Sequence, residues 1–209
     1  MEIPELLLVD KPKGITSFDV IRILRKKFGK IKMGHAGTLD PNATGLLIVG
    51  IGKGTKQIKN LVGLPKEYEA EILFGQRTDS GDITGTVVET KTIPSLDQKI
   101  IEQMLTGMVG KHILNVPLYS AVRKNGKRMY EHAYKGRTVE TPIKEMNLIS
   151  ARLLNHALDT AVIWMQVASG TYIRSLVEEL GKRLGTVATL KNLRRISIGD
   201  FHIKDATKI

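Results

Sequence analysis

The sequence of 209 residues contains no cysteine, which excludes disulfide bonds and thiolate metal sites. Signs of secretion are also missing. The start, Met1 to Glu5, is acidic and leads directly into the short apolar run Leu6 to Val9, without a basic region or a cleavage site. We therefore expect no signal peptide and no transmembrane segment, and we expect the protein to work in a reducing cytoplasm.

Several common catalytic motifs are absent as well. The stretch Gly50 to Thr55 looks like a phosphate-binding loop, but it satisfies neither the Walker spacing nor GxGxxG. The histidines show no metal-binding spacing such as HExxH, and the nucleophile elbow GxSxG does not occur. Nucleotide loops, metal hydrolysis and serine triads are therefore disfavoured.

Positive charge is abundant and unevenly distributed. Lys and Arg number 32 against 21 Asp and Glu, a formal net charge of +11. The cations cluster at residues 25–32, 53–59, 123–137 and 191–195, and acids gather between Glu67 and Glu102. Such asymmetry favours a polyanionic partner, with RNA or DNA as the leading candidate, because neutralising phosphates releases counterions. The alternative is that a basic surface only keeps the protein soluble.

The apolar pattern predicts a mixture of helices and strands. Thr16-Ser17 offers a cap for a helix from Phe18 to Phe28, and Gly29 can end it. The predicted inward-facing residues of this helix and of two others are Val20, Ile21, Leu24 and Phe28; Ile100, Ile101, Met104 and Leu105 of a helix from Ser95; and Ile173, Leu176, Val177, Leu180 and Leu184 of a helix beginning near Tyr172.

Alternation predicts half-buried strands at Tyr68 to Phe74, Thr86 to Thr90 and Ala161 to Ala168. The hydrophobic content of 42% suffices to bury the core of one large domain or of two small ones. Because strands and helices do not alternate as strict βαβ units, we predict an α+β fold with a largely antiparallel sheet.

One acidic side chain stands in a glycine-rich segment. Gly34 to Gly45 contains three glycines, a proline and Asp40, directly before the apolar run Leu46 to Val49. Glycine lets a backbone approach a ligand closely, so this segment is interpreted as a loop that presents Asp40. The alternative is an ordinary Asp-Pro turn with an Asx hydrogen bond.

Four further residues are candidates for the same site. Tyr172 and Arg174 stand at the start of a predicted helix after a strand, where Arg174 can pair with Asp40. Tyr68 heads a strand and can stack on a base, and Leu193 can form a pocket wall. Each has a simpler explanation, since tyrosines in strands and leucines usually belong to the core and arginines usually lie on solvated surfaces.

Taken together, ordered segments of the sequence resemble the TruB family of tRNA pseudouridine synthases nearly from end to end. The loop with Gly37-Thr38-Leu39-Asp40-Pro41 is specific for the family's catalytic loop, and Gly170 to Arg174 supports it independently. The other matching segments are Val9 to Ser17, Gly52 to Lys56, Lys66 to Tyr68, Gly75 to Gly85, Tyr119 to Ala121, Asn125 to Arg128, Tyr130-Glu131, Leu193 to Arg195 and Gly199 to Phe201.

This resemblance implies a mixed, mostly antiparallel sheet flanked by helices, a cofactor-free and metal-free isomerase, and uridine 55 in the T loop of tRNA as substrate. It implies that Asp40 is the nucleophile, that Arg174 is its ion-pair partner and that Tyr68 stacks on the uracil. Tyr172 and Leu193 are expected to line the pocket. Whether Asp40 attacks the uracil ring or the ribose stays open.

The resemblance also carries expectations about His35 and about the domains. His35 is expected to support the flipped loop rather than to act as an acid or base. The whole chain, residues 1–209, is expected to form one catalytic domain, with a mobile thumb at about 120–146. Since only eight residues follow Phe201, we expect the C-terminal PUA domain of bacterial members to be absent, with weaker tRNA affinity as a result.

Three alternatives accompany this interpretation. A catalytically silent RNA-binding or tRNA-remodelling protein of the same fold would explain the charge but gives Asp40 and Arg174 no purpose. A dyskerin-type guide-dependent synthase shares the motifs but carries extra domains. A small-molecule phosphate enzyme would need an anion-binding loop that the sequence lacks. The favoured partner is the T-arm of tRNA, bound by a monomer that needs no protein partner.

Overall fold

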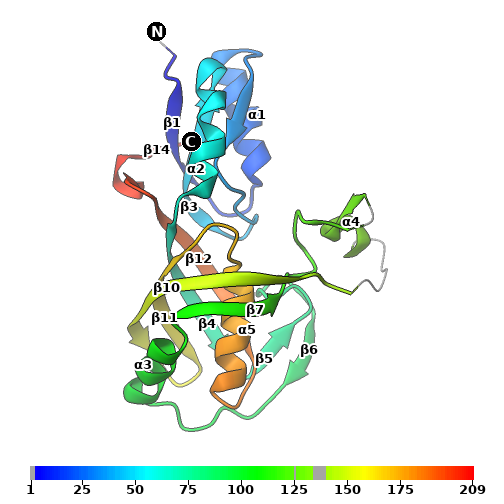
Figure 1. Ribbon diagram of the computed structural model, residues 1–209, viewed down its shortest axis with the longest axis vertical. Helices are drawn as coiled ribbons and strands as arrows, with labels where there is room; N and C mark the ends of the chain where they lie inside the picture. Colours follow the sequence, from blue (N-terminus) through cyan, green and yellow to red (C-terminus); the bar gives the residue numbers. More distant parts are fainter. Residues whose placement is uncertain (1–2, 125, 134–139) are drawn as a thin grey trace. The chain divides into compact units, whose positions relative to one another are not determined.

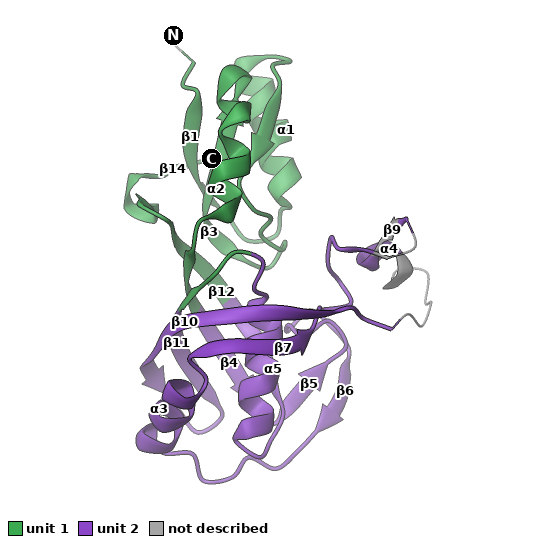
Figure 2. Ribbon diagram, in the orientation of Figure 1, with its two compact units in different colours: residues 1–69, 166–169, 193–209 green, residues 70–165, 170–192 purple. Residues whose placement is uncertain are grey.

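The computed structural model describes residues 3–124, 126–133 and 140–209 (Figure 1). The chain forms two compact units (Figure 2). Unit 1 comprises Met1–Glu69, Gln166–Ser169 and Leu193–Ile209, and unit 2 comprises Ala70–Met165 and Gly170–Asn192. Strands β4, β11 and β12 contain residues of both units, so three of the four passages between the units fall within strands and the fourth falls between Ser169 and Gly170.

Unit 1 is built around the apolar strand β3 (Thr44–Ile51). This strand pairs antiparallel with β1 (Leu6–Lys11) and β2 (Met33–His35), and parallel with β12 (Ala188–Ile198). The remaining elements of unit 1 are α1 (Ser17–Phe28), η1 (Gly52–Lys56), α2 (Ile58–Gly63), β13 (Phe201–His202), η2 (Ile203–Asp205) and β14 (Thr207–Lys208). Strand β14 pairs parallel with β1, and β13 pairs antiparallel with β12.

Helices α1 and α2 cover opposite faces of β3, because successive strand side chains point to opposite sides. One face carries Leu47 and Val49, which pack with the buried residues of α1. The other face carries Leu46 and Ile48, which pack with Leu61 of α2. Strand β3 is therefore buried on both faces, as its uninterrupted apolar sequence requires.

Helix α1 confirms its prediction. Thr16 is the N-cap and forms a capping box with Asp19, and Gly29 ends the helix with a φ of 88°. Its residues Val20, Ile21 and Leu24 are buried, and Phe28 is half-buried. A local cap at each end and an apolar stripe at helical spacing are sufficient to specify this helix.

Unit 2 contains the second part of the sheet and helices of its own. The strand order here is β12, β4 (Lys66–Phe74), β11 (Thr160–Val167), β10 (Ile143–His156) and β7 (Gly110–Asn115). Smaller pairs are β5 (Gln76–Thr78) with β6 (Val87–Thr90) and β8 (Arg123–Lys124) with β9 (Lys127–Arg128), and the helices are α3 (Gln98–Gly107), α4 (Met129–Ala133) and α5 (Ile173–Arg183).

Most of the predicted elements of unit 2 are confirmed. Buried residues alternate along β4 and β11, and the predicted stripe of α5 is buried. Two details are wrong. Helix α3 is capped by Asp97 instead of Ser95, so it starts later than predicted, and Ile100 is 39% exposed instead of facing inward. Strand β6 lies in a two-stranded ribbon with both valines exposed, so it is not half-buried.

The α+β prediction is confirmed at the level of fold class. Ten strands are joined by hydrogen bonds into one sheet that contains both antiparallel and parallel pairs. The predicted thumb includes β8, β9 and α4, while its residues 125 and 134–139 lie outside the described residues. None of the helices in the described part of the chain combines the length and apolar character needed to cross a bilayer.

Candidate active site

The glycine-rich segment lies between β2 and β3 in unit 1 and contains a turn at Asp40. The amide of Ala43 donates to the carbonyl oxygen of Asp40 over 3.0 Å, which closes the turn. The Asp-Pro turn is therefore present, closed by a backbone hydrogen bond, and a loop that presents Asp40 can contain such a turn. The side chain of Asp40 is half-buried.

The start of helix α1 holds this loop from one side. The hydroxyl of Ser17 accepts a hydrogen bond from the amide of Leu39 over 2.8 Å and donates to the carbonyl of Leu39 over 3.1 Å. Ser17 and Leu39 are both buried, so these bonds are shielded from water. One hydroxyl thus satisfies both backbone groups of the residue that precedes Asp40.

Lys11, at the end of β1, holds the loop from the other side. Its ammonium donates to the carbonyls of Pro12, Ile15 and Pro41 at 2.9, 2.7 and 3.4 Å, and its side chain is fully buried. Burial lowers the pKa of Lys11 from 10.5 to about 8, and the nearby carboxylate of Asp40 partly opposes that shift. Lys11 therefore supplies positive charge close to the candidate nucleophile and also fixes the residue that follows it.

A second buried cation, Arg195 of β12, lies beneath the same loop. Its guanidinium donates to the carbonyls of Leu46 over 2.7 Å and Gly37 over 3.1 Å. Lys66, whose ammonium donates to the carbonyls of Val62 and Leu64, is also buried. Burial, followed by the positive charge of Arg195, lowers the pKa of Lys66 to about 8. Two buried cations thus bind carbonyls of the loop itself, Lys11 at Pro41 and Arg195 at Gly37, whereas Lys66 binds carbonyls at the end of α2.

Gly45 allows β12 to approach the end of the loop. Its φ is +102°, and a Cβ at this position would lie 2.7 Å from the backbone nitrogen of Arg195 and closer still to its carbonyl oxygen. Any other residue would push β12 away from β3. The glycine is therefore needed for both its conformation and its lack of a side chain.

His35 lies on β2 at the start of the loop and is half-buried. Burial and, secondly, the positive charge of Arg195 lower the pKa of His35, although a backbone hydrogen bond of Gly37 works against the shift. Within the described residues its Nδ1 is buried without a hydrogen-bond partner. These conditions favour a neutral imidazole.

The structure places Tyr68 and Leu193 in unit 1, with Asp40 and His35. Tyr68 lies on β4 and is only 7% exposed, so a stacking role requires that its ring face become accessible to a base. Leu193 lies on β12 and is half-buried, and its carbonyl accepts a hydrogen bond from the hydroxyl of Thr44 over 3.4 Å. Leu193 is thus tied to the strand that follows the loop.

Arg174 and Tyr172 belong to unit 2. Tyr172 is the N-cap of α5, and its amide lies 3.5 Å from the sulfur of Met146. Arg174 is 5% exposed, and its guanidinium donates to the carbonyls of Ser80 over 2.8 Å and Tyr119 over 3.0 Å. Arg174 is therefore held by backbone groups from two loops. Its pairing with Asp40 stays a prediction.

The loop that binds Arg174 is organised by short polar side chains. Asp82 accepts hydrogen bonds from the hydroxyl of Ser80 and from the amide of Thr84, and Thr86 donates its amide to Asp79. These are the local bonds that Asp and Ser form in turns. This run, Thr78 to Asp82, lies in a segment that matches the family, but no role is predicted for it from the sequence. Its Asp, Ser and Gly residues favour turns, and this composition is the signal that indicates a loop here.

The sequence interpretation missed four supporting residues of unit 1, namely Ser17, Lys11, Lys66 and Arg195. All four lie in segments that match the family, which is the signal that could have found them, but lysine and arginine are usually exposed and their types gave no sign of a buried role. Among the residues that the structure describes, no group of three or more His, Asp or Glu side chains is placed to hold a metal ion.

Comparisons with known proteins agree with this geometry. Residues 25–173 match the model of the TruB family pseudouridylate synthase (N terminal domain). The chain is 44% identical over 201 residues to tRNA pseudouridine synthase B of Caldicellulosiruptor saccharolyticus, covering 96% of this chain and 69% of the relative. It is 39% identical to tRNA pseudouridine synthase B of Chlorobaculum tepidum, covering 98% of this chain and 88% of that relative.

A solved structure is also similar. The crystal structure of a Cbf5-Nop10-Gar1 complex contains a chain with a TM-score of 0.74 and 25% identity, and the match covers 98% of this chain and 52% of that one. The present chain thus spans about half the length of that solved protein. Because the family model matches most of the sequence and the curated relatives align over nearly all of it, the chain belongs to the TruB family of pseudouridylate synthases.

Proposed function

We propose that this protein isomerises uridine 55 in the T loop of tRNA to pseudouridine, with Asp40 as the nucleophile. The observation that carries this proposal is the loop of unit 1, where Ser17 and Lys11 hold the residues on both sides of one carboxylate. Membership of the TruB family supplies the reaction, and the basic composition supports an RNA substrate.

The reaction requires that the uridine first leave its stack. The C1′–N1 bond then breaks, the uracil rotates, a C1′–C5 bond forms, the C5 proton is lost and N1 gains a proton. Extruding the base costs a few kcal/mol, and stacking on one aromatic ring returns about 1–3 kcal/mol. We assign this stacking to Tyr68, and contacts to phosphates must supply the rest.

The other site residues are assigned to binding and positioning. Arg174 balances and orients the carboxylate of Asp40, because an unpaired buried charge costs several kcal/mol. Tyr172 and Leu193 line the pocket of the extruded base, and His35 supports the loop as a neutral side chain. With a reference pKa of about 3.9, an aspartate needs no further help to ionise at neutral pH.

The test is tritium release from tRNA labelled at C5 of uridine. The wild type is expected to release tritium, and Asp40→Asn is expected to reduce the rate at least 1,000-fold, on the order of 4 kcal/mol. The matched control is Asp205→Asn, which removes an exposed carboxylate of the same unit and is expected to leave the rate unchanged.

Equal release by wild type and Asp40→Asn, or none by either, would overturn the proposal. Absence of release with intact tRNA binding would favour the silent RNA-binding alternative. The assay uses the purified chain alone, since we propose that it acts in the cytoplasm as a monomer without a protein partner or guide RNA. A requirement for either would contradict that part.

A further inference from the structure

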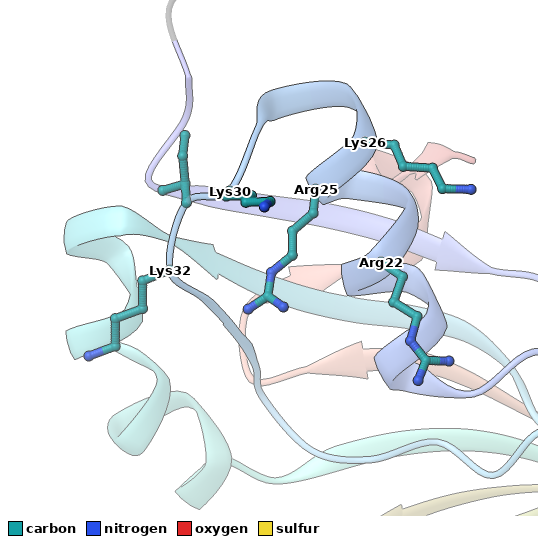
Figure 3. A pocket seen from close by; sticks show the side chains of 6 residues that line it. Arg22, Arg25, Lys26, Lys30 and Lys32 are labelled. Carbon is teal, nitrogen blue, oxygen red and sulfur yellow. The ribbon is translucent and has the colours of Figure 1, made fainter.

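A hollow of about 570 Å³ in unit 1 is lined almost entirely by cations. It lies between the last turns of α1 and the segment that leads into β2 (Figure 3). Arg25 extends from the helix toward the segment that carries Lys30 and Lys32 (Figure 3). The full lining consists of one half-buried isoleucine and five exposed cations: Arg22, Arg25, Lys26, Lys30, Ile31 and Lys32.

Most of this positive charge is not neutralised by the protein. Arg22 forms an ion pair with Asp19 over 2.6 Å, and its guanidinium also lies over the ring of Phe18. Within the described part of the chain, the other four cations of the hollow form no ion pair with a carboxylate. Their attraction for an external anion is therefore undiminished by internal partners.

The helix dipole explains only part of this cluster. Cations in the last turn of a helix are favoured by the partial negative charge at its C-terminus, and Arg25 and Lys26 are placed there. Lys30 and Lys32 follow Gly29, which ends the helix. Their presence on the same hollow is therefore unexplained by helix stability.

The hollow lies a few nucleotide lengths from the loop of the candidate nucleophile, as measured along helix α1. Ser17, at the first turn of α1, is hydrogen-bonded to the residue before Asp40. Nine residues later along the helix, Lys26 lies about 13 Å farther on, at about 1.5 Å per residue. A nucleic-acid strand advances about 3.4 Å per nucleotide, so this separation corresponds to about four nucleotides.

We propose that this basic hollow binds the sugar-phosphate backbone of the tRNA substrate, outside the nucleotides that enter the active site. The inference rests on the proposed function, because it takes the occupant to be the RNA that meets Asp40. Guanidinium groups bind phosphate through paired hydrogen bonds, and ammonium groups bind it as point charges. Such contacts set affinity and register and do not select the base.

The decisive variant combines Arg25→Gln, Lys30→Gln and Lys32→Gln. Its control combines Lys91→Gln, Lys99→Gln and Lys111→Gln, which removes the same charge from exposed positions of unit 2. The affinity for full-length tRNA is measured over a range of salt concentrations. The first variant is expected to bind about tenfold or more weakly, with a salt slope lowered by about 2 to 3, and the control by less than 1.

Substrate length gives a second readout. On a short RNA that ends fewer than four nucleotides from the target uridine on both sides, the hollow variant is expected to bind as the wild type does, because the phosphates that reach the hollow are missing. At saturating full-length tRNA, its rate of tritium release is also expected to be unchanged. A lowered rate at saturation, or equal losses in the variant and the control, would overturn the inference.

These measurements separate this inference from the proposed function. Tritium release with tRNA affinity unchanged in the hollow variant would defeat the inference alone. Weaker tRNA binding by the hollow variant, with no tritium release by the wild type, would refute the proposed isomerase activity and would still support RNA binding by the hollow. Binding of anionic vesicles through the hollow, with tRNA affinity unchanged, would assign the surface to a different partner and overturn the inference.

Discussion

Two sets of cations in unit 1 differ in their burial and in the groups to which they are bonded. The inner set, Lys11, Lys66 and Arg195, is buried and donates to backbone carbonyls, which for Lys11 and Arg195 include Pro41 and Gly37 of the loop of Asp40. The outer set, which lines the hollow at the end of α1, is exposed, and within the described residues Arg22 alone among its cations pairs with a carboxylate. The same residue types thus serve as internal supports in one place and as a surface for anions in the other.

Burial accounts for the difference. A buried cation must satisfy its donors within the protein, because leaving them unpaired costs several kcal/mol. Carbonyl oxygens of loops are suitable partners, since they otherwise lack the partners that helices and sheets provide. An exposed cation is hydrated and can exchange water for phosphate at little cost. The comparison therefore predicts stability effects for the inner set and binding effects for the outer set.

The largest expected loss of stability is that of Gly45→Ala, which would displace the backbone of Arg195 in the inner set. The new Cβ would meet the backbone of Arg195 in a conformation that disfavours side chains, so we expect a loss of at least about 3 kcal/mol in the free energy of unfolding. Urea denaturation checks this. Gly63→Ala, at a helical position with no atom within 4 Å, is the control, and it is expected to leave stability unchanged or to raise it by up to about 1 kcal/mol. Equal stabilities of the two variants would contradict the close approach of β12.

Arg195→Met removes one inner cation and keeps most of its volume. Because the carbonyls of Gly37 and Leu46 lose their donor, we expect a loss of about 2–4 kcal/mol in thermal or urea unfolding. The neighbouring Arg194 pairs with Asp10 and is 40% exposed, so Arg194→Met is expected to cost about 1 kcal/mol or less. A larger cost for Arg194 would reverse the comparison.

The contribution of Lys66, a member of the inner set, to the free energy of unfolding is expected to depend on pH. Burial holds its pKa at about 8 in the folded protein against 10.5 when exposed, so the unfolded chain binds more protons between these values. Stability contributed by this group therefore rises from about pH 8 to pH 10.5 and is constant below. Relative to Lys66→Met, the wild type is expected to gain up to about 3 kcal/mol across that range.

Urea titrations at several pH values measure this difference. Exposed Lys59→Met is the control, for which the difference from wild type is expected to stay constant with pH. A wild type that loses stability relative to Lys66→Met as the pH rises would show that Lys66 is stabilised in its charged form, contrary to the effect of burial.

Ser17→Ala tests the contact between α1 and the loop. Loss of both hydrogen bonds to Leu39 is expected to cost about 1–2 kcal/mol in unfolding free energy. If the loop positions Asp40, the rate of tritium release at saturating tRNA should fall as well, at a temperature where the variant is folded. Thr55→Ala, which removes a hydroxyl bonded to Gly52 instead, serves as the control. A lowered rate in both variants would argue against a specific role for Ser17.

The smallest stability effect is expected in the outer set. Lys30→Gln should change the free energy of unfolding by less than about 0.5 kcal/mol, because an exposed cation without a partner contributes little. Its tRNA affinity should still fall measurably at low salt. A large stability loss in thermal unfolding, with unchanged tRNA affinity, would mean that Lys30 behaves like the inner set and would contradict the distinction between the two sets.

Local patterns predicted the elements that carry their own signals. Helix α1 has a cap, an apolar stripe and a terminal glycine within its own residues, and β4 alternates as its burial does. Helix α3 was placed less well, because both Ser95 and Asp97 can cap a helix and the hydrogen bond selects Asp97. Strand β6 has an apolar sequence but lies in a two-stranded ribbon, which its own residues do not reveal.

The residues of the candidate site were predicted with roles from ordered motifs, whereas their supports lie in the same matching segments but received no role. Asp40 stands in a recognisable loop, whereas Arg195 reaches that loop from 158 residues away at Gly37. Nothing near Arg195 in the sequence distinguishes it from Arg194, since adjacent strand residues simply point to opposite faces. Which face is buried depends on the strands and helices packed around β12.

Amino-acid order alone therefore predicted helices α1, α3 and α5 and strands β4 and β11, the excess of positive charge and the position of the acidic residue in the glycine-rich loop. The packing of β12 against β3, and of α1 against the loop, decided which of the 32 cations became buried supports and which stayed available to an anion. The reason is physical: local structure follows from neighbouring residues, whereas burial follows from contacts between segments that are distant in the chain.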